Sequence, residues 1–295
     1  MATISELLAQ GLALRNVSDT AKLDAELLLA FVLGKPRSYL FAWPEREPGV
    51  AEVSHYRALL ARRLAGEPVA HLIGSREFWS LPLMVDASTL IPRPETERLV
   101  ELALQCTDRM TVATSRQQVR VLDLGTGTGA IALALASERP AWKVVGVEQE
   151  PAALALAKRN RAALALGNVE LVQSNWFAAL PRGERFHTIV SNPPYIDADD
   201  PHLQEGDVRF EPRSALVAAD RGLADIAHIV RAAPAYLEPG GWLLLEHGAT
   251  QGDAVRSLLT GSGYSSVQTW RDYGDRERVT GGRRGQQTED HSDDE

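Results

Sequence analysis

The sequence predicts an α/β protein in which a mostly parallel, seven-stranded sheet follows a small helical domain and a β-hairpin linker. Apolar residues recur at helical spacing up to about residue 64, and short apolar stretches broken by glycine and proline follow. Strands then alternate with helices, which is typical of a parallel sheet covered by helices on both faces. We therefore expect a helical domain over 1–68, a hairpin linker over 69–91 and an α/β domain over 92–282.

The first 68 residues combine helical periodicity with residue types that start and stop helices. Ser18 and Asp19 are good N-cap residues and Gly34 is a good terminator, so we expect a helix between them. Gly66 and Pro68 are expected to end the last helix of this domain. The apolar positions that support these helices include Leu23, Leu27, Leu28, Phe31, Val50, Val53, Leu60 and Leu64.

The hairpin and the sheet are expected in the remainder of the chain. Gly74, Ser75 and Pro82 interrupt short apolar stretches, which indicates a hairpin. A helix is expected over about residues 95–105, after two prolines. The expected strands are VRVLDL, KVVGVE, VELVQS, HTIVSN and GWLLLE, with YSSVQTW and RERVTGG as a closing hairpin at the sheet edge.

Size and composition restrict the classes of function. The 295 residues are 44% hydrophobic, enough for one large core and one small core. No stretch of about 18 uncharged apolar residues occurs and the N-terminus lacks a signal-peptide pattern, so we expect a cytoplasmic protein without a membrane partner. The single cysteine, Cys106, cannot form an internal disulfide and is expected to be buried. The seven histidines lack metal-ligand spacing, so no metal is expected.

The net charge of −8 lies partly in the C-terminal tail. Residues 283–295 contain five acidic residues against two arginines and no apolar periodicity, so we expect a disordered acidic tail. The remaining body is only mildly acidic, and no broad basic field is available to hold the phosphates of a nucleic acid. We therefore expect no direct nucleic-acid substrate. Separately, we expect the protein to be a monomer.

A glycine-rich run, VLDLGTGTGA, occupies residues 121–130 between a strand and a helix. Glycines at this place let the backbone approach a nucleotide-like ligand at the carboxyl edge of an open sheet. The run fits the dinucleotide pattern G-x-G-x-x-G/A, and Glu148 ends the next strand about 20 residues later, where an acid binds ribose. Nicotinamide and adenosylmethionine cofactors both carry such a ribose. Gly129 and Asp123, however, resemble the first motif of class I methyltransferases.

The run Asn192, Pro193, Pro194 and Tyr195 follows the fourth strand of the α/β domain and suits methyl transfer to a planar nitrogen. Such a nitrogen is a poor nucleophile until it is oriented. The Asn192 side-chain carbonyl and the Pro193 backbone carbonyl can each accept one N–H of an NH₂ group. The prolines stiffen the loop, and Tyr195 can stack on the flat group. A simple turn is the alternative interpretation of this tetrapeptide.

The two motifs together resemble the amino-methyltransferases, which include adenine N6-methyltransferases of DNA and RNA and protein glutamine N5-methyltransferases. Further segments resemble the bacterial peptide chain release factor glutamine N5-methyltransferase family, from the helical domain to about residue 283. This resemblance implies a Rossmann-like class I methyltransferase domain. It also implies methylation of the glutamine side-chain amide in the Gly-Gly-Gln motif of class I release factors. The segments that carry it are HLIG (71–74), EFW (77–79), LIPRPETE (90–97), SNWF (174–177) and FEPR with the following AL (210–216).

The resemblance also implies roles for individual residues. Glu148 would accept hydrogen bonds from the cofactor ribose, Trp176 would pack near its adenine, and Asn192 would touch both ligands. The substrate amide would be held by Asn192, Pro193, Pro194 and Tyr195, of which Asn192, Pro193 and Tyr195 act in catalysis. The helical domain and hairpin would help to dock the protein substrate. The residues that would line the methionine and ribose part of S-adenosylmethionine are Gly125, Thr126, Gly127, Thr128 and Gly129.

The sequence departs from the family pattern at three positions. Glu148 and Asn175 stand where aspartate is usual, and His71 stands where tyrosine is common. The longer Glu148 side chain still reaches a ribose diol, so only the affinity for the cofactor is in question. Arg93 fits a substrate clamp and helix-entry chemistry equally well. His247 fits a core or loop histidine better than a catalytic base.

Three other functions compete with the glutamine N5-methyltransferase of release factors. An adenine N6-methyltransferase would use the same tetrapeptide on a flipped base, but it should carry a basic recognition region. A ribosomal-protein glutamine N5-methyltransferase is a closer alternative, and the amino-acid sequence of residues 91–97 disfavours it. A non-catalytic binding module with this fold is disfavoured by the intact glycine run and the intact Asn192.

Overall fold

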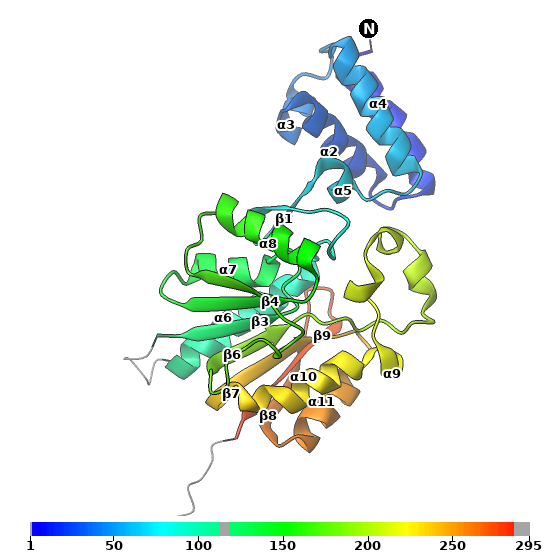
Figure 1. Ribbon diagram of the computed structural model, residues 1–295. Coiled ribbons are helices and arrows are strands. Elements are labelled where there is room, and N and C mark those ends of the chain that lie inside the picture. The colour runs from blue at the N-terminus through cyan, green and yellow to red at the C-terminus, as the bar shows by residue number, and fades with distance from the viewer. Residues whose placement is uncertain (1, 112–117, 286–295) are drawn as a thin grey trace, which may run out of the picture. The chain divides into compact units, whose positions relative to one another are not determined.

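The computed structural model describes residues 2–111 and 118–285, which form two compact units (Figure 1). One unit is helical and the other contains the large sheet. The sequence-based division used continuous segments, whereas the chain passes between these units repeatedly. The helical unit comprises Met1–Arg76, Val85–Ala87 and Pro201–Glu211, and the sheet unit comprises Glu77–Met84, Ser88–Asp200 and Pro212–Glu295.

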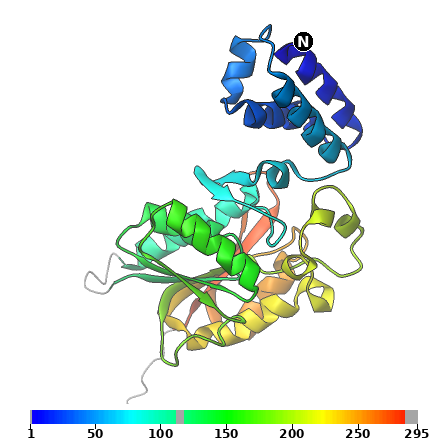
Figure 2. The same ribbon diagram turned by 45° about the horizontal axis from the view of Figure 1, so that its top comes forward.

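The helical unit, whose N-terminal helices are drawn in blue in Figure 2, has its own apolar core, as expected from its periodicity. Leu28 and Leu29 are fully buried there, and the buried Tyr56 hydroxyl donates to the Leu7 carbonyl oxygen at 3.1 Å. The hydroxyl is thus paired inside the core, where an unpaired polar group would be costly. The elements are α1 (Ile4–Gln10), η1 (Gly11–Asn16), α2 (Ala21–Leu33), α3 (Arg37–Ala42), α4 (Val50–Leu64) and α5 (Val69–Ile73).

The expected helix after Ser18 is confirmed as α2. Different residues determine its two ends. Gly34 ends the helix in the left-handed conformation at φ 60°. At the start, Thr20 is the N-cap residue but makes no side-chain capping bond. Its hydroxyl and that of Ser18 instead donate to the Asp24 carboxylate, at 2.9 and 2.8 Å.

The expected hairpin exists but is shorter than residues 69–91. Val69–Ile73 forms α5 instead of a strand, because Pro68 leads into a helical turn and Gly74 ends it at φ 69°. The hairpin consists of β1 (Ser75–Phe78) and β2 (Leu81–Met84). The two residues between the strands have φ values of 52° and 58°, the left-handed backbone that a tight two-residue hairpin turn requires.

The main sheet has the seven strands that the sequence predicts, in the order β5-β4-β3-β6-β7-β9-β8. The pairs among β3 to β7 are parallel, whereas β9 is antiparallel to both β7 and β8. The strands are β3 (Arg120–Leu124), β4 (Lys143–Glu148), β5 (Val169–Gln173), β6 (Phe186–Ser191), β7 (Leu237–Glu246), β8 (Tyr264–Arg271) and β9 (Glu277–Arg284).

Helices cover both faces of this sheet (Figure 1). Alternating strand residues face the two sides, so Val121 belongs to one core and its neighbour Leu122 to the other. The helix expected over residues 95–105 is longer and is preceded by the short turn η2 (Pro94–Thr96). One face is covered by α6 (Glu97–Thr111), α7 (Ala130–Glu138) and α8 (Pro151–Ala163), and the other by α10 (Ala224–Ala232) and α11 (Gly252–Gly261).

The order of the strands reverses between β3 and β6. From β3 the chain adds β4 and β5 on one side, and it then returns to place β6 on the other side of β3. In such sheets ligands bind at the carboxyl ends of the strands, where the order reverses. Leu124 at the end of β3 is paired with Ser191 at the end of β6, so the segments that follow these residues start side by side.

The C-terminal tail begins later than expected. Disorder from residue 283 is wrong for Arg283 and Arg284, which belong to β9. Arg283 is paired with Trp242, and its guanidinium Nε donates to the Gly240 carbonyl oxygen at 3.0 Å. This pairing extends the closing hairpin into the polar sequence. The rest of the tail prediction concerns residues 286–295, which lie outside the described residues.

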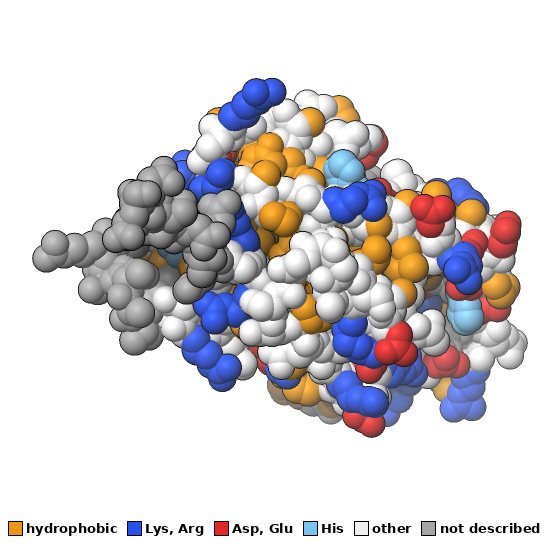
Figure 3. Space-filling model, turned by 90° about the horizontal axis from the view of Figure 1, so that it is seen from below, with side chains coloured by type: hydrophobic (Ala, Val, Ile, Leu, Met, Phe, Trp, Pro, Cys, Tyr) orange, Lys and Arg blue, Asp and Glu red, His pale blue; other side chains and the backbone are white. Residues whose placement is uncertain are grey.

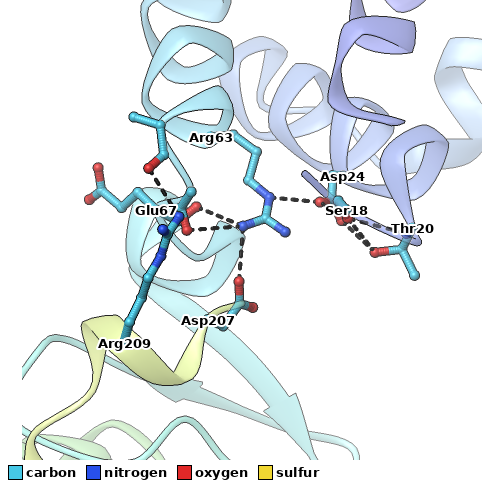
Figure 4. Close-up of polar contacts among 9 residues, drawn as sticks. Ser18, Thr20, Asp24, Arg63, Glu67, Asp207 and Arg209 are labelled. Atoms are coloured by element: carbon cyan, nitrogen blue, oxygen red, sulfur yellow. Dashed lines mark hydrogen bonds and ion pairs between the residues drawn. The ribbon is translucent and has the colours of Figure 1, made fainter. Parts of the chain in front are cut away.

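A buried arginine joins distant parts of the helical unit (Figure 4). Arg63 on α4 donates from Nε to Asp24 at 2.8 Å and from Nη1 to Asp207 at 2.9 Å. The Arg63 and Asp24 side chains are each 7% exposed, whereas Asp207 is 37% exposed. The Arg209 guanidinium adds a bond to the Ala65 carbonyl oxygen at 3.3 Å. The segment Pro201–Glu211 is therefore bound to the rest of the helical unit through charged groups.

We expect Arg63→Met to lower the free energy of unfolding by about 3–5 kcal/mol, because it leaves Asp24 buried without its positive partner. The neighbouring Arg62→Met is the matched control. Arg62 is 53% exposed and pairs with Glu67, so its loss should cost only about 0–1 kcal/mol. Urea unfolding of the full chain, followed by circular dichroism, measures both. Equal effects of the two substitutions would contradict the structural role of Arg63.

Candidate functional site

The glycine-rich run forms the loop between β3 and α7. Gly125, Gly127 and Gly129 have φ values of 71°, 54° and 86°, which explains the three glycines. The backbone N–H groups of Gly125 and Thr126 donate to the Val147 carbonyl oxygen at 3.0 and 2.9 Å. The loop is thereby fixed to the neighbouring strand β4. Gly129 is the N-cap residue of α7, so its role is to start the helix.

A buried carboxyl group braces the base of this loop. Asp123 is fully buried and accepts from the Thr126 hydroxyl at 2.5 Å and from the Ala132 backbone N–H at 3.2 Å. Burial raises the pKa of Asp123 to about 7, and the bond from Thr126 acts in the opposite direction. Asp123 lies behind the loop and holds its shape, which makes it a structural residue of the site.

Glu148 lies at the end of β4, across from the glycine loop. One of its carboxylate oxygens accepts from the Gly127 backbone N–H at 2.9 Å, and the other accepts from the Glu150 backbone N–H at 3.0 Å. These two bonds fix the orientation of the carboxylate. Each carboxylate oxygen has two acceptor positions, so both can also accept from a ligand hydroxyl.

Trp176 lies against the glycine loop. A β-carbon added at Gly125 would lie 3.4 Å from the Trp176 ring, which is ordinary van der Waals contact, so the ring lies directly over this glycine. Trp176 itself has a left-handed φ of 48°. The Ser174 hydroxyl stabilises this turn by donating to the Trp176 carbonyl oxygen at 2.8 Å. Sequence reasoning selected Trp176 but missed Ser174.

Asn192 follows β6 and lies beside the glycine loop. The preceding residue, Ser191, donates its hydroxyl to the Leu124 carbonyl oxygen at 2.7 Å, which fastens the two strand ends together. The Asn192 side-chain Nδ2 donates to the Thr96 hydroxyl oxygen at 3.2 Å. In this orientation Oδ1 is the Asn192 atom that remains as an acceptor for a ligand.

The remainder of the tetrapeptide is held from behind. Pro193 is buried, and the Tyr195 backbone carbonyl oxygen accepts from the Gln251 side chain at 3.0 Å. The Tyr195 hydroxyl points to Oε1 of Glu246 at 3.4 Å. Burial, followed by the nearby negative charge of Glu246, raises the pKa of Tyr195. Sequence reasoning missed Gln251, Thr96 and Glu246.

The glycine loop and Asn192 open into one cavity of about 220 Å³. Pro194 and Arg93 also lie on its wall, whereas Gly129, Pro193 and Tyr195 are not among the residues that line it. The cavity therefore joins the two motifs that sequence analysis selected separately. The predicted residues that line it are Gly125, Thr126, Gly127, Thr128, Glu148, Trp176, Asn192 and Pro194.

Two further residues behave as structural groups. The His247 ring is fully buried, and its nitrogens are bonded to the Gly248 carbonyl and the Thr280 hydroxyl at 2.8 and 2.7 Å. Burial lowers the pKa of His247, which agrees with a satisfied core histidine. Cys106 is buried in the sheet unit, as expected for a small apolar side chain.

Two features are absent from residues 2–111 and 118–285. Among them there is no group of three or more His, Cys, Asp or Glu side chains that could hold a metal ion. Nor does this part of the chain contain a helix that is both long enough and apolar enough to cross a membrane.

Comparisons with known proteins match both parts of the chain. Residues 6–74 match the family described as PrmC N-terminal domain, and residues 107–206 match the Methyltransferase small domain. The methyltransferase from Pyrococcus furiosus has a similar fold, with a TM-score of 0.51 and 19% identity over 76% of this chain and 97% of that one. The hMettl16 catalytic domain aligns with a TM-score of 0.55 and 15% identity over 76% of this chain and 81% of its own.

Curated relatives are much more similar in sequence. Release factor glutamine methyltransferase of Salmonella typhimurium is 58% identical over 90% of this chain and 93% of its own length. The proteins of that name from Escherichia coli and Pseudomonas aeruginosa are 53% and 56% identical, over 94% and 89% of this chain and 97% and 92% of their own lengths. The chain therefore belongs to the release factor glutamine methyltransferase family.

Proposed function

We propose that this protein transfers the methyl group of S-adenosylmethionine to the side-chain amide nitrogen of the glutamine in the Gly-Gly-Gln motif of class I release factors. One observation carries the proposal. Asn192, an acceptor for amide N–H groups, and the glycine loop line the same cavity. Membership of the release factor glutamine methyltransferase family supports the choice of substrate.

The residues around the glycine loop fit S-adenosylmethionine. The backbone of Gly125 and Gly127 allows close approach of the methionine and ribose part, and the fixed carboxylate of Glu148 can accept from the ribose diol. The half-buried Trp176 offers an apolar ring for the adenine. When bound, S-adenosylmethionine supplies an electrophilic methyl group on a positively charged sulfur.

The Asn192 loop would orient the nucleophile. An amide nitrogen donates its lone pair into the carbonyl group, so it reacts only when it is aimed at the methyl carbon. Asn192 Oδ1 and the Pro193 carbonyl oxygen would each accept one N–H of the glutamine side chain. The amide nitrogen then bonds to the methyl carbon as the carbon–sulfur bond breaks with its electron pair left on sulfur. One amide proton leaves to water.

The choice of a glutamine over an adenine base is supported by surface charge. A nucleic-acid substrate requires many Lys and Arg contacts to phosphates. On the face drawn in Figure 3, Lys and Arg side chains lie in separate groups among acidic, apolar and uncharged ones. The chain as a whole carries a net charge of −8. A Gly-Gly-Gln loop also suits a narrow cavity, because its glycines extend the backbone without side-chain clashes.

We expect incubation with S-adenosylmethionine and a class I release factor to add one methyl group to that glutamine, as detected by mass spectrometry. Asn192→Ala should lower the rate by about 100-fold or more, because the amide loses its orienting acceptor. A release factor with alanine in place of the glutamine should receive no methyl group. Methylation of duplex DNA, ribosomal RNA or a ribosomal protein, with the release factor unmodified, would overturn the proposal.

We expect Glu148→Ala to weaken binding of S-adenosylmethionine by about 1.5–3 kcal/mol, or about tenfold or more in Kd, because a charge-assisted bond is lost. Glu170→Ala is the matched control. Glu170 follows on the neighbouring strand β5, is 53% exposed and pairs with Lys143, so its loss should leave the affinity unchanged. Isothermal calorimetry measures both variants. Wild-type affinity of Glu148→Ala would show that another group binds the ribose.

A further inference from the structure

Two consecutive prolines make the segment from Asn192 to Tyr195 stiff. A proline ring fixes its own φ, and it also restricts the preceding residue to an extended backbone. Asn192 and Pro193 each precede a proline, so both are restricted in this way. Neither proline has an N–H group that could bond to a neighbouring element. The place of the Asn192 side chain therefore depends on how the two ends of this short segment are fixed.

The two ends of the segment are held by different groups. At the first end, the Ser191 hydroxyl donates to the last carbonyl oxygen of β3 at 2.7 Å. At the other end lies the peptide group between Tyr195 and Ile196. Its N–H donates to the Leu216 carbonyl oxygen at 2.9 Å, and its carbonyl oxygen accepts from Nε2 of Gln251 at 3.0 Å. The carbonyl side of this peptide group is thus held by a side chain from a distant part of the sequence.

The Gln251 carboxamide is bonded in a way that fixes its direction. Gln251 is the N-cap residue of α11, and its Oε1 accepts from the Gly248 backbone N–H at 2.8 Å. Its Nε2 donates to the Tyr195 carbonyl oxygen and also to the Arg221 carbonyl oxygen at 3.2 Å. In the reversed orientation the Gln251 oxygen would face two carbonyl oxygens, none of which can donate. The NH₂ group is therefore directed at Tyr195.

Gly222 leaves room for the same carbonyl oxygen. It ends α9 (Ala219–Gly222) and has a left-handed φ of 82°. A β-carbon added at Gly222 would lie 2.0 Å from the Tyr195 carbonyl oxygen, far closer than van der Waals contact. Glycine is therefore required at this position both by the backbone conformation and by the approach of the tetrapeptide. Gln251 and Gly222 together determine where the Tyr195 carbonyl group lies.

We infer that Gln251 is a positioning residue that fixes the Tyr195 backbone and thereby holds Asn192 where it can orient the substrate amide. The inference rests on the proposed amide methylation and adds a residue to it. Gln251 is not among the residues that line the cavity, so it acts through the tetrapeptide and not on the reacting atoms. The glycine loop is bonded separately to β4, so binding of S-adenosylmethionine should not depend on Gln251.

Gln251→Met removes all three side-chain bonds and keeps a similar side-chain length. We expect kcat with the release factor to fall about tenfold to 100-fold, because a small misplacement of the group that orients the nucleophile costs rate on that order. The Kd for S-adenosylmethionine, measured by calorimetry, should stay at the wild-type value. The KM for the release factor should change less than kcat.

Gln251→Glu shows which of the three bonds matters. An ionised carboxylate can still accept from the Gly248 N–H, but it cannot donate to the Tyr195 carbonyl oxygen. We therefore expect Gln251→Glu to lower kcat at least as much as Gln251→Met does. Wild-type kcat in this variant would show that the bond to Gly248 is sufficient and that Gln251 does not position the tetrapeptide.

Asn168→Leu is the matched control for Gln251→Met. The Asn168 side chain also donates to backbone carbonyl oxygens, but it directly precedes β5, at the edge of the sheet opposite the site. The carbonyl groups are those of Ala136, Arg139 and Trp142, at 3.1, 3.3 and 3.2 Å. Both substitutions should lower the urea midpoint of unfolding, because backbone carbonyl groups lose their donors. Asn168→Leu should nevertheless keep the wild-type kcat.

Gly222→Ala displaces the same carbonyl oxygen and does not depend on the folding of the Gln251 variants. We expect kcat to fall about tenfold or more, because the added methyl group pushes on the Tyr195 backbone. Gly263→Ala is its control. Gly263 has a φ of 80°, and no atom of the described residues lies within 4 Å of an added β-carbon there. It therefore carries the same backbone strain, and its kcat should stay at the wild-type value.

The outcomes separate this inference from the proposed function. Wild-type kcat in Gln251→Met or in Gly222→Ala would overturn the positioning role while the wild type still methylates the glutamine. A loss of rate in Asn168→Leu equal to that in Gln251→Met would overturn it as well, because lost stability alone would then explain the effect. Failure of the wild-type protein to methylate the release factor would instead overturn the proposed function.

Discussion

β3 and β6 run side by side in the same direction, and Leu124 at the end of one is paired with Ser191 at the end of the other. The Ser191 hydroxyl bonds to the Leu124 carbonyl oxygen and fastens this pair. Because of this register, the glycine loop and the Asn192 loop leave the sheet next to each other. A shift of register would separate the proposed binding loop for the methyl donor from the proposed binding loop for its acceptor. Both halves of the proposed site depend on this one pairing.

Buried polar groups behind the site hold these loops in shape. Asp123 braces the glycine loop through the Thr126 hydroxyl, and Glu246 reaches Tyr195 directly. Each carboxyl group is buried enough that its pKa is raised to about 7. Preorganised polar groups of this kind reduce the reorganisation needed during reaction. Neither carboxyl group is among the residues that line the cavity, so both support its wall from outside.

The features that the sequence predicted are local in the chain. Strand positions follow from short apolar runs such as KVVGVE, and Gly125 and Gly127 are required by left-handed backbone. The position of the Asn192 loop was also predicted from local sequence, because the loop follows directly after a strand. Residues whose partners are distant in sequence were missed, because periodicity carries no information on such pairs. Asn192 and Thr96 are 96 residues apart, and Arg63 is 144 residues from Asp207. The inclusion of Pro201–Glu211 in the helical unit could not be predicted for the same reason.

We propose that the Asn192 loop holds a glutamine amide against the methyl donor bound by the glycine loop. A crystal structure of the protein with S-adenosylhomocysteine and a Gly-Gly-Gln peptide tests it most directly. We predict that the amide nitrogen lies within hydrogen-bond distance of both Asn192 Oδ1 and the Pro193 carbonyl oxygen, and faces the sulfur atom. A glutamine side chain bound elsewhere, or held by neither of these oxygens, would contradict the account.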